Sequence, residues 1–182
     1  FEFSPSEKSL SGKYECRKFF IKKFARQGNS EITLCENVIK QSGYLEPDED
    51  NKNIYFSFHG RLVRQKGIPV IIDLIDKLFA EHQNVRLIIN GQGEHYLQEE
   101  LSKKAEQYPG KLVFLCGYER SLARLCTACG DFALFPSEFE PCGLEDFIAQ
   151  IYGTIPIAHS TGGLKKIVNG KSGFTYSPNT SD

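Results

Sequence analysis

The sequence lacks methionine and tryptophan entirely, and it lacks any long apolar run. Its apolar stretches fall far short of the roughly 20 residues that a membrane-spanning helix needs. The N-terminus also lacks the basic, apolar and small-residue pattern of a secretory signal peptide. We therefore expect no contact with a membrane. Since the chain begins at Phe1 and has no methionine, we expect it to be a fragment of a longer protein.

A large net charge of either sign is also missing. The chain has 22 lysines and arginines against 23 aspartates and glutamates, so its formal net charge is −1. Without an overall positive field we expect no binding to nucleic acid, and any anion site must depend on local groups. The length of 182 residues suits one domain with a substantial core.

The spacing of the six cysteines does not indicate a framework of disulfides or metal sites. They are scattered through a chain large enough to fold without such links, so reduced thiols are expected. Cys126 and Cys129 have the spacing of a redox or zinc pair, but no second pair or histidine cluster accompanies them. We interpret them as packing residues of a helix, and we expect no metal and no cofactor.

From Asn53 onward, short apolar runs alternate with helical patterns. This alternation is typical of β-α-β units and predicts an α/β fold with a parallel sheet. The runs are nearly continuous in apolar residues, as in strands covered on both faces. The expected strands are 54–58, 86–90, 112–116, 132–135 and 155–158.

Helical spacing of apolar residues fills the segments between these strands. Pro69 suits the first turn of a helix that continues to about Phe79. A second helical pattern ends before the turn Pro109-Gly110. A third helix is expected to bury Leu144, Phe147, Ile148 and Ile151.

The first fifty residues have a different character. Residues 13–26 (KYECRKFFIKKFAR) have the pattern of a basic amphipathic helix, and residues 43–53 are polar and acidic. A helix packed on a neighbour outside this sequence is favoured over a membrane or calmodulin-type contact. We therefore predict a helical arm and polar linker over 1–52 and a separate folded domain over 53–182.

Ligands of open parallel sheets bind beyond the carboxyl ends of the strands, so the loops there are the candidates. The loop HGRLVRQKG provides Gly60, where a ligand can approach the backbone, and the cations Arg61 and Lys66 for phosphate oxygens. Ordinary surface charges are the alternative. The next loop, NGQGE, lacks the third glycine of a dinucleotide fingerprint, and we interpret it as a tight turn.

The segment SEFEPCGLEDF (137–147) lies at the next strand-to-helix junction. Gly143 begins a helix whose free N–H groups suit an anion or hydroxyl, and Glu140 is expected to face the occupant. Cys142 is expected to pack in a small space rather than to act as a nucleophile. The later segment STGGL (160–164) adds flexible backbone amides. Together the loops predict a pocket for a sugar that carries a diphosphate.

Six motifs in order carry a resemblance to a known family: HGRLVRQKG, INGQGE, Gly117-Tyr118, PSEFEPCGL, YGTIPIAHSTGGL and SGFTY. Over roughly residues 53–177 the chain resembles the C-terminal half of bacterial glycogen synthases and plant starch synthases. The resemblance implies a Rossmann-like parallel sheet with helices on both faces, the C-terminal half of a GT-B fold. It implies a cytoplasmic protein, or a plastid one in a plant.

The resemblance also implies an activity and its partners. The family transfers glucose from ADP-glucose, or UDP-glucose in some members, to the non-reducing end of an α-1,4-glucan with retention of configuration. Residues 53–182 would be the nucleotide-sugar-binding domain. The N-terminal domain of the same protein, which is missing here, would hold the glucan acceptor, so the fragment alone is expected to be inactive.

Individual roles follow from the same resemblance. Arg61 and Lys66 would neutralise the diphosphate leaving group, and Glu140 would stand beside the glucose ring, which makes these three the implied catalytic residues. Glu140 is not expected to be a covalent nucleophile, because the two-carboxylate geometry of retaining hydrolases is not evident. The implied substrate-binding residues are Gly60, Tyr118, Cys142, Gly143, Leu144, Thr161, Gly162 and Gly163.

Three places depart from the family pattern. His159-Ser160 stands where basic residues often precede TGGL, which leaves acceptor or phosphate contacts on that side open. Glu145 stands where a small or hydroxylated residue is usual, and its side chain is expected to point away from the phosphates. Ile148 replaces the second acid of the E-x7-E pattern of related transferases. Two alternatives therefore remain open. One is another retaining GT-B glycosyltransferase, and the other is a non-catalytic module that binds a nucleotide sugar or glucan.

Overall fold

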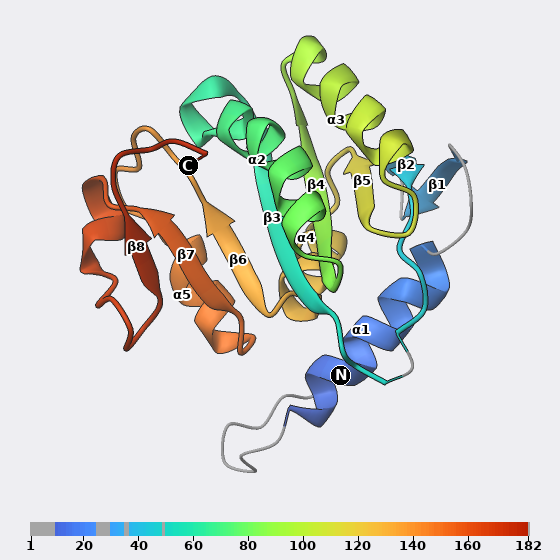
Figure 1. The fold of residues 1–182 in the computed structure, drawn as a ribbon, viewed down its shortest axis with the longest axis horizontal. Coiled ribbons are helices and arrows are strands. Elements are labelled where there is room, and N and C mark those ends of the chain that lie inside the picture. Colours follow the sequence, from blue (N-terminus) through green and yellow to red (C-terminus); the bar gives the residue numbers. More distant parts are fainter. Residues whose placement is uncertain (1–9, 25–29, 35–36, 49, 182) are drawn as a thin grey trace.

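The computed structural model describes residues 10–24, 30–34, 37–48 and 50–181. In these residues one mixed sheet is covered by helices on both faces (Figure 1). The strands are β1 (Ser30–Leu34), β2 (Asn37–Gly43), β3 (Ile54–Leu62), β4 (Val85–Gly93), β5 (Leu112–Cys116), β6 (Phe132–Phe135), β7 (Ile155–His159) and β8 (Phe174–Tyr176). The helices are α1 (Ser11–Phe24), α2 (Ile68–Glu81), α3 (His95–Gln107), α4 (Arg120–Cys129) and α5 (Glu145–Ile151), with the 3-10 helices η2 (Arg64–Lys66) and η3 (Gly162–Lys166).

The sheet has the strand order β1-β2-β5-β4-β3-β6-β7-β8. All neighbours from β5 to β8 pair in parallel, whereas β1 and β2 are antiparallel to their neighbours. The predicted α/β class is confirmed, and the five expected strands are present, with β3, β4 and β7 longer than predicted. The chain runs from β3 outward to β5 and then returns to place β6 on the other side of β3. The strand order therefore reverses between β3 and β6.

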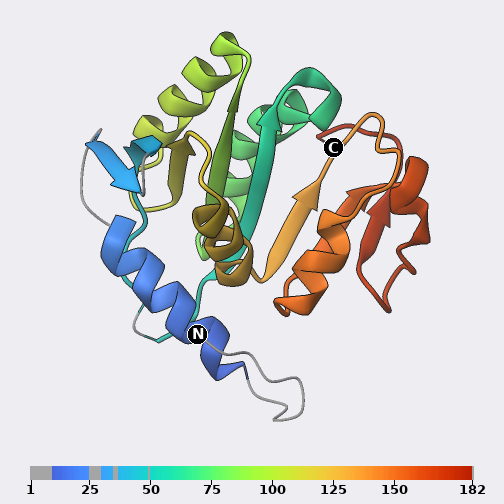
Figure 2. The ribbon, with the colours of Figure 1, turned by 180° about the vertical axis from the view of Figure 1, so that it is seen from behind.

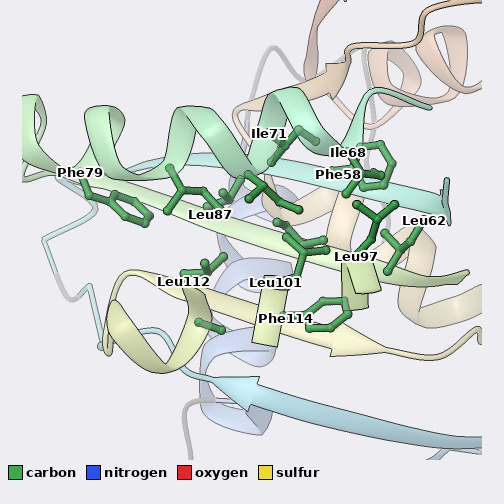
Figure 3. Packing of buried hydrophobic residues seen from close by; sticks show 14 of the residues in the cluster. Phe58, Leu62, Ile68, Ile71, Phe79, Leu87, Leu97, Leu101, Leu112 and Phe114 are labelled. Atoms are coloured by element: carbon green, nitrogen blue, oxygen red, sulfur yellow. The ribbon is translucent and has the colours of Figure 1, made fainter. Parts of the chain in front are cut away.

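The helices α2 and α3 cover one face of the sheet, and α1, α4 and α5 lie on the other, as the views from the front and from behind show (Figures 1 and 2). The apolar stripe predicted for α2 is confirmed, since Ile71, Ile75 and Phe79 are buried. They pack with strand residues such as Leu87 (Figure 3). Each fully buried side chain of this size contributes about 1.5–3 kcal/mol. A rigid platform for the loops results.

The N-terminal region differs from its prediction. Residues 30–34 and 37–43 form two antiparallel strands that pair with each other, and β2 extends the sheet by pairing with β5, with Lys40 opposite Cys116. No strand was expected there, because these polar segments have no strong apolar alternation and the pairing of β2 depends on β5, which is remote in sequence. The boundary at residue 52 remains a prediction, although the sheet itself continues across it.

The expected basic helix is present as α1, but its neighbour lies within the chain. It packs against α4 (Figure 2). Lys13 donates a hydrogen bond to the carbonyl of Ala128 (3.1 Å), and Arg17 donates one to the carbonyl of Cys129 (3.0 Å) and pairs with Asp131 (2.6 Å). Because the last carbonyls of a helix lack helical partners, these buried cations cap the C-terminus of α4. The prediction of a neighbour outside the sequence is wrong for this face of the helix.

The predicted buried stripe of α5 is also wrong. Leu144, Phe147 and Ile151 are 66%, 50% and 67% exposed, whereas Asp146 and Ala149 are buried. The helix has only seven residues, so a few fixed contacts at its first turn decide which side faces the sheet. None of the helices in the described ranges is long and apolar enough to cross a membrane.

Candidate functional site

A pocket of about 390 Å³ opens at the carboxyl ends of the parallel strands. It lies where β3 and β6 diverge, because a reversal of strand order sends the two following connections to opposite faces and leaves a crevice between them. Of the predicted site residues, Gly60, Arg61, Lys66, Tyr118, Glu140, Gly143 and Leu144 line this pocket. The prediction of a single pocket shared by several loops is therefore supported for these seven.

The three residues predicted to be catalytic meet in this pocket. The ammonium group of Lys66, at the end of η2, forms an ion pair with the carboxylate of Glu140 in the loop after β6. The hydroxyl of Ser137 donates a hydrogen bond to the same carboxylate (3.2 Å). Arg61 lines the pocket beside them and forms no ion pair among the described residues. One cation is thus engaged by an acid and another is available to an anion.

Close backbone contact holds the loops after β3 and β6 together. Gly67 has a positive φ of 73°, and a Cβ at this position would lie 1.9 Å from the carbonyl oxygen of Pro136. Next to it, the backbone N–H of Glu138 donates to the carbonyl of Gln65 (2.9 Å). Because only glycine permits this approach, the last glycine of HGRLVRQKG fixes the distance between the two loops.

The STGGL segment supports the acidic loop from behind. The backbone N–H of Gly163 donates to the carbonyl of Glu140 (2.7 Å), and a Cβ on Gly162 would lie 2.1 Å from that same oxygen. A Cβ on Gly163 would lie 2.1 Å from the carbonyl of Cys142. Thr161, Gly162, Gly163 and Cys142 do not line the pocket. Their predicted contacts with substrate therefore remain predictions, and their observed contacts position Glu140.

The loop NGQGE is not the tight turn that the sequence suggested, because β4 continues to Gly93. A Cβ on Gly91 would lie 2.0 Å from the carbonyl oxygen of Gly60, so this glycine permits the close approach of β3 and β4 where they pair. The buried Asn90 donates hydrogen bonds to the carbonyls of Leu115 (2.9 Å) and Gly117 (3.2 Å). These bonds fix the turn that carries the pocket residue Tyr118.

The expectation that Glu145 points away from the pocket is wrong. Its side chain lines the pocket, with one carboxylate oxygen 3.1 Å from the Arg124 guanidinium and 3.3 Å from Nε2 of His59. The hydrogen bond with His59, followed by the charges of His59 and Arg124, lowers the pKa of Glu145 below its usual range. Because these partners come from α4 and β3, the sequence of the α5 region could not reveal this orientation.

Sequence reasoning also missed the cations of α4. Arg120 and Arg124 both line the pocket. A signal was available, since α4 directly follows the Gly117-Tyr118 turn and residues four apart lie on one face of a helix. With Arg61 and Lys66, these arginines give the pocket four permanent cations, which suits an anion with several oxygens.

A lysine of η3 connects the acidic loop to α5. Lys166 pairs with the buried carboxylate of Asp146 (3.0 Å) and donates to the carbonyls of Cys142 (2.9 Å) and Gly143. The ammonium group also lies 4.1 Å from the ring centre of Phe147. These contacts explain why Asp146 rather than the apolar stripe is the buried side of α5.

The cysteines take no part in a metal cluster within the described ranges. Cys126 and Cys129 are buried in α4, and burial raises the pKa of both thiols. The described residues contain no group of three or more side chains that could hold a metal ion. Cys142 is exposed, contrary to its expected packing, and Cys35 lies outside the described residues.

A family model for glycosyl transferases group 1 matches residues 46–182. The chain belongs to this family. The group 1 domain is similar to the glycogen synthase of Desulfitobacterium hafniense, with 42% identity over 127 residues, 66% of this chain and 27% of that protein. The glycogen synthase of Thermodesulfovibrio yellowstonii is 35% identical over 161 residues, 87% of this chain and 31% of that protein.

A solved structure agrees with these matches. The catalytic domain of starch synthase IV from Arabidopsis thaliana, bound to ADP and acarbose, superposes with a TM-score of 0.74 and 25% identity. The match covers 94% of the group 1 chain and 33% of the starch synthase chain. The predicted resemblance to glycogen and starch synthases and the Rossmann-like GT-B fold are confirmed. The chain spans about a third or less of the length of the relatives that it matches.

Proposed function

We propose that this chain is the nucleotide-sugar-binding domain of a glycogen or starch synthase. In the proposed reaction, glucose passes from ADP-glucose, or UDP-glucose, to the non-reducing end of an α-1,4-glucan with retention of configuration. The observation that carries the proposal is the pocket between β3 and β6, where Lys66 pairs with the acid Glu140 and Arg61 lines the same pocket. The names of the relatives, and the ADP in the starch synthase structure, support the same substrate class.

The charges in the pocket suit cleavage of a glycosyl phosphate. Breaking that bond leaves positive charge on the sugar ring and negative charge on the diphosphate. Stabilising groups of both signs are therefore needed at the two ends of the bond. The diphosphate would compete with Glu140 for Lys66 and would also meet the available guanidinium of Arg61. Once the ion pair is separated, the lysine would stabilise the negative charge on the leaving diphosphate, and the carboxylate would stabilise the positive charge on the sugar ring.

The acceptor glucan and the rest of the enzyme also belong to the proposal. The glycogen synthases matched by this chain are more than three times as long as their aligned part, since the alignment covers 27% and 31% of them. We assign the acceptor site to another domain of the same protein, which would close over the pocket. On this view the 182-residue chain binds the sugar nucleotide but does not elongate glucan alone.

Binding of ADP to this chain tests the substrate assignment. We expect Arg61→Ala and Lys66→Ala to weaken ADP binding in calorimetry by tenfold or more, because a hydrogen bond between charged groups contributes about 1.5–3 kcal/mol. Arg64→Ala is the matched control, since Arg64 lies outside the pocket and pairs with Glu138 on the surface. Circular dichroism verifies folding. Unchanged affinity in both pocket variants would contradict the proposal.

A longer protein carrying this domain separates the proposed activity from its alternatives. We expect radiolabelled glucose to pass from ADP-glucose to a maltooligosaccharide. Transfer to a different acceptor alone would favour another retaining GT-B glycosyltransferase. Binding of the sugar nucleotide without any transfer would favour the non-catalytic module, for which the acid at Glu145 and the apolar Ile148 are the relevant sequence features.

A further inference from the structure

Besides Glu140 and Asp146, the pocket is lined by a third acid, which the proposed reaction does not use. Glu145 is the first residue of α5, and its side chain is 45% exposed within the pocket. Its carboxylate lies between Arg124 from α4 (3.1 Å) and His59 from β3 (3.3 Å). An acid in this position occupies a cation that could otherwise contact an anionic ligand.

We propose that Glu145 is a specificity-determining residue that competes with the ligand's phosphates for Arg124 and limits how strongly the pocket binds anions. The proposal rests on the proposed function, because it assumes that a nucleoside diphosphate enters this pocket. It goes beyond that function by assigning a role to an acid that has none in the proposed reaction, where the acid beside the sugar is Glu140.

The arrangement of charges supports competition. The pocket has four permanent cations, and two of them are engaged by its acids: Glu140 pairs with Lys66, and Glu145 pairs with Arg124. The remaining acid that lines the pocket, Asp146, pairs instead with Lys166. Neither Arg61 nor Arg120 forms an ion pair among the described residues. An incoming diphosphate therefore meets two available cations and two that acids already occupy.

Because the Glu145 carboxylate lies in the pocket, its effect on binding should depend on the charge of the ligand. A carboxylate within several ångströms of a phosphate repels it, and in a partly exposed site this repulsion is of the order of one kcal/mol. Repulsion grows with the number of negative charges on the ligand and falls as salt screens it. A residue with a purely structural role would change binding of charged and neutral ligands alike.

Glutamine at position 145 separates charge from shape. Glu145→Gln keeps the size of the side chain and its ability to hydrogen-bond with Arg124 and His59, but removes the negative charge. Glu145→Thr is a second neutral variant with a smaller side chain. Glu138→Gln is the matched control, because Glu138 is 52% exposed, pairs with Arg64 and lies outside the pocket.

We would titrate ADP, AMP and adenosine into the 182-residue chain and its variants by calorimetry at low and high salt. We expect Glu145→Gln to bind ADP about threefold to tenfold more tightly than wild type at low salt. The gain should be smaller for AMP, absent for adenosine, and reduced at high salt. Glu145→Thr should show the same order of gains, and Glu138→Gln should match wild type.

The outcomes distinguish failure of this inference from failure of the proposed function. If wild type binds ADP and Arg61→Ala weakens it, but neither neutral variant at position 145 binds more tightly, the inference is wrong and the function stands. A gain of equal size for adenosine would also overturn it, since charge would not be the cause. If wild type and all variants fail to bind ADP, both the function and the inference fall.

Discussion

Lys66 and Glu140 form an ion pair across the pocket although 74 residues separate them in the sequence. The pairing depends on how two loops meet. Gly67 lets the loop after β3 approach Pro136 in the loop after β6, and this contact brings the ammonium and carboxylate groups together. The fold itself therefore brings these two groups of the site together.

The Lys66–Glu140 pair should show measurable coupling in a double-mutant cycle of unfolding by urea. Its side chains are only 26% and 18% exposed, so we expect about 1 kcal/mol of coupling between Lys66→Ala and Glu140→Ala. The pair Arg64–Glu138 is the control, since its side chains are 77% and 52% exposed and should couple by close to zero. Equal coupling in both pairs would contradict the packing described for the pocket.

Gly163→Ala should disrupt the support of the acidic loop. The added methyl group would lie 2.1 Å from the carbonyl oxygen of Cys142, so the loop bearing Glu140 must shift. We expect a loss of about 2 kcal/mol or more in the free energy of unfolding, with weaker ADP binding. Gly170→Ala is the control, because its φ of 74° is strained for alanine but its methyl group meets nothing within 4 Å. It should cost only about 1 kcal/mol and leave ADP binding unchanged.

The buried Lys13 should give stability a pH dependence in the alkaline range. Burial lowers its pKa from 10.5 to about 8, although Asp131 opposes the shift. Between these pH values the unfolded chain keeps a proton that the folded chain has lost. The free energy of unfolding of wild type should therefore rise relative to Lys13→Met as pH increases, by at most about 3 kcal/mol.

Urea unfolding of wild type and Lys13→Met between pH 7 and 11 measures this difference. The comparison with the variant is needed because other groups titrate in the same range. Lys18→Met is the control, since Lys18 is exposed and pairs with Glu15 on the surface of α1. A constant difference between wild type and Lys13→Met at all pH values would show that Lys13 keeps its proton in the folded protein.

Alkylation should distinguish the cysteines by their surroundings. Cys142 is exposed and should react with iodoacetamide in the folded protein. Cys126 and Cys129 should not react, because burial raises the pKa of their thiols and shields the sulfur atoms. Mass spectrometry of peptides after labelling, with and without urea, measures this. Rapid native labelling of Cys126 would contradict its packing in α4.

The periodicity of the sequence predicted most of the central sheet because each buried strand and helix carries its own local pattern. The residues of α2 that face the sheet follow from spacing alone, and so does the placement of Arg61 and Lys66 near the carboxyl end of β3, although β3 continues through Arg61 to Leu62. The face of α5 could not be predicted in this way. A helix this short has too few residues for its apolar pattern to outweigh the specific contacts between Asp146 and Lys166.

Long-range contacts limited the prediction elsewhere too. The pairing of β2 with β5 and the caps that Lys13 and Arg17 provide for α4 join residues that are 70 or more positions apart. The orientation of Glu145 depends on His59 and Arg124, which arrive from two other elements. The sequence pattern of a single segment cannot predict contacts between side chains of different elements. The position of each partner is set by the packing of the sheet and not by its neighbours in the sequence.

The sequence by itself determined the alternation of strands and helices, the glycines at close approaches and the kinds of charge available after each strand. These are local properties, since backbone preference and apolar spacing act over a few residues. Only the tertiary structure decided which charges meet. Lys66 reaches Glu140, and Arg124 reaches Glu145, because the reversal of strand order beside β3 brings the loops after β3 and β6 and the helices α4 and α5 to a single crevice.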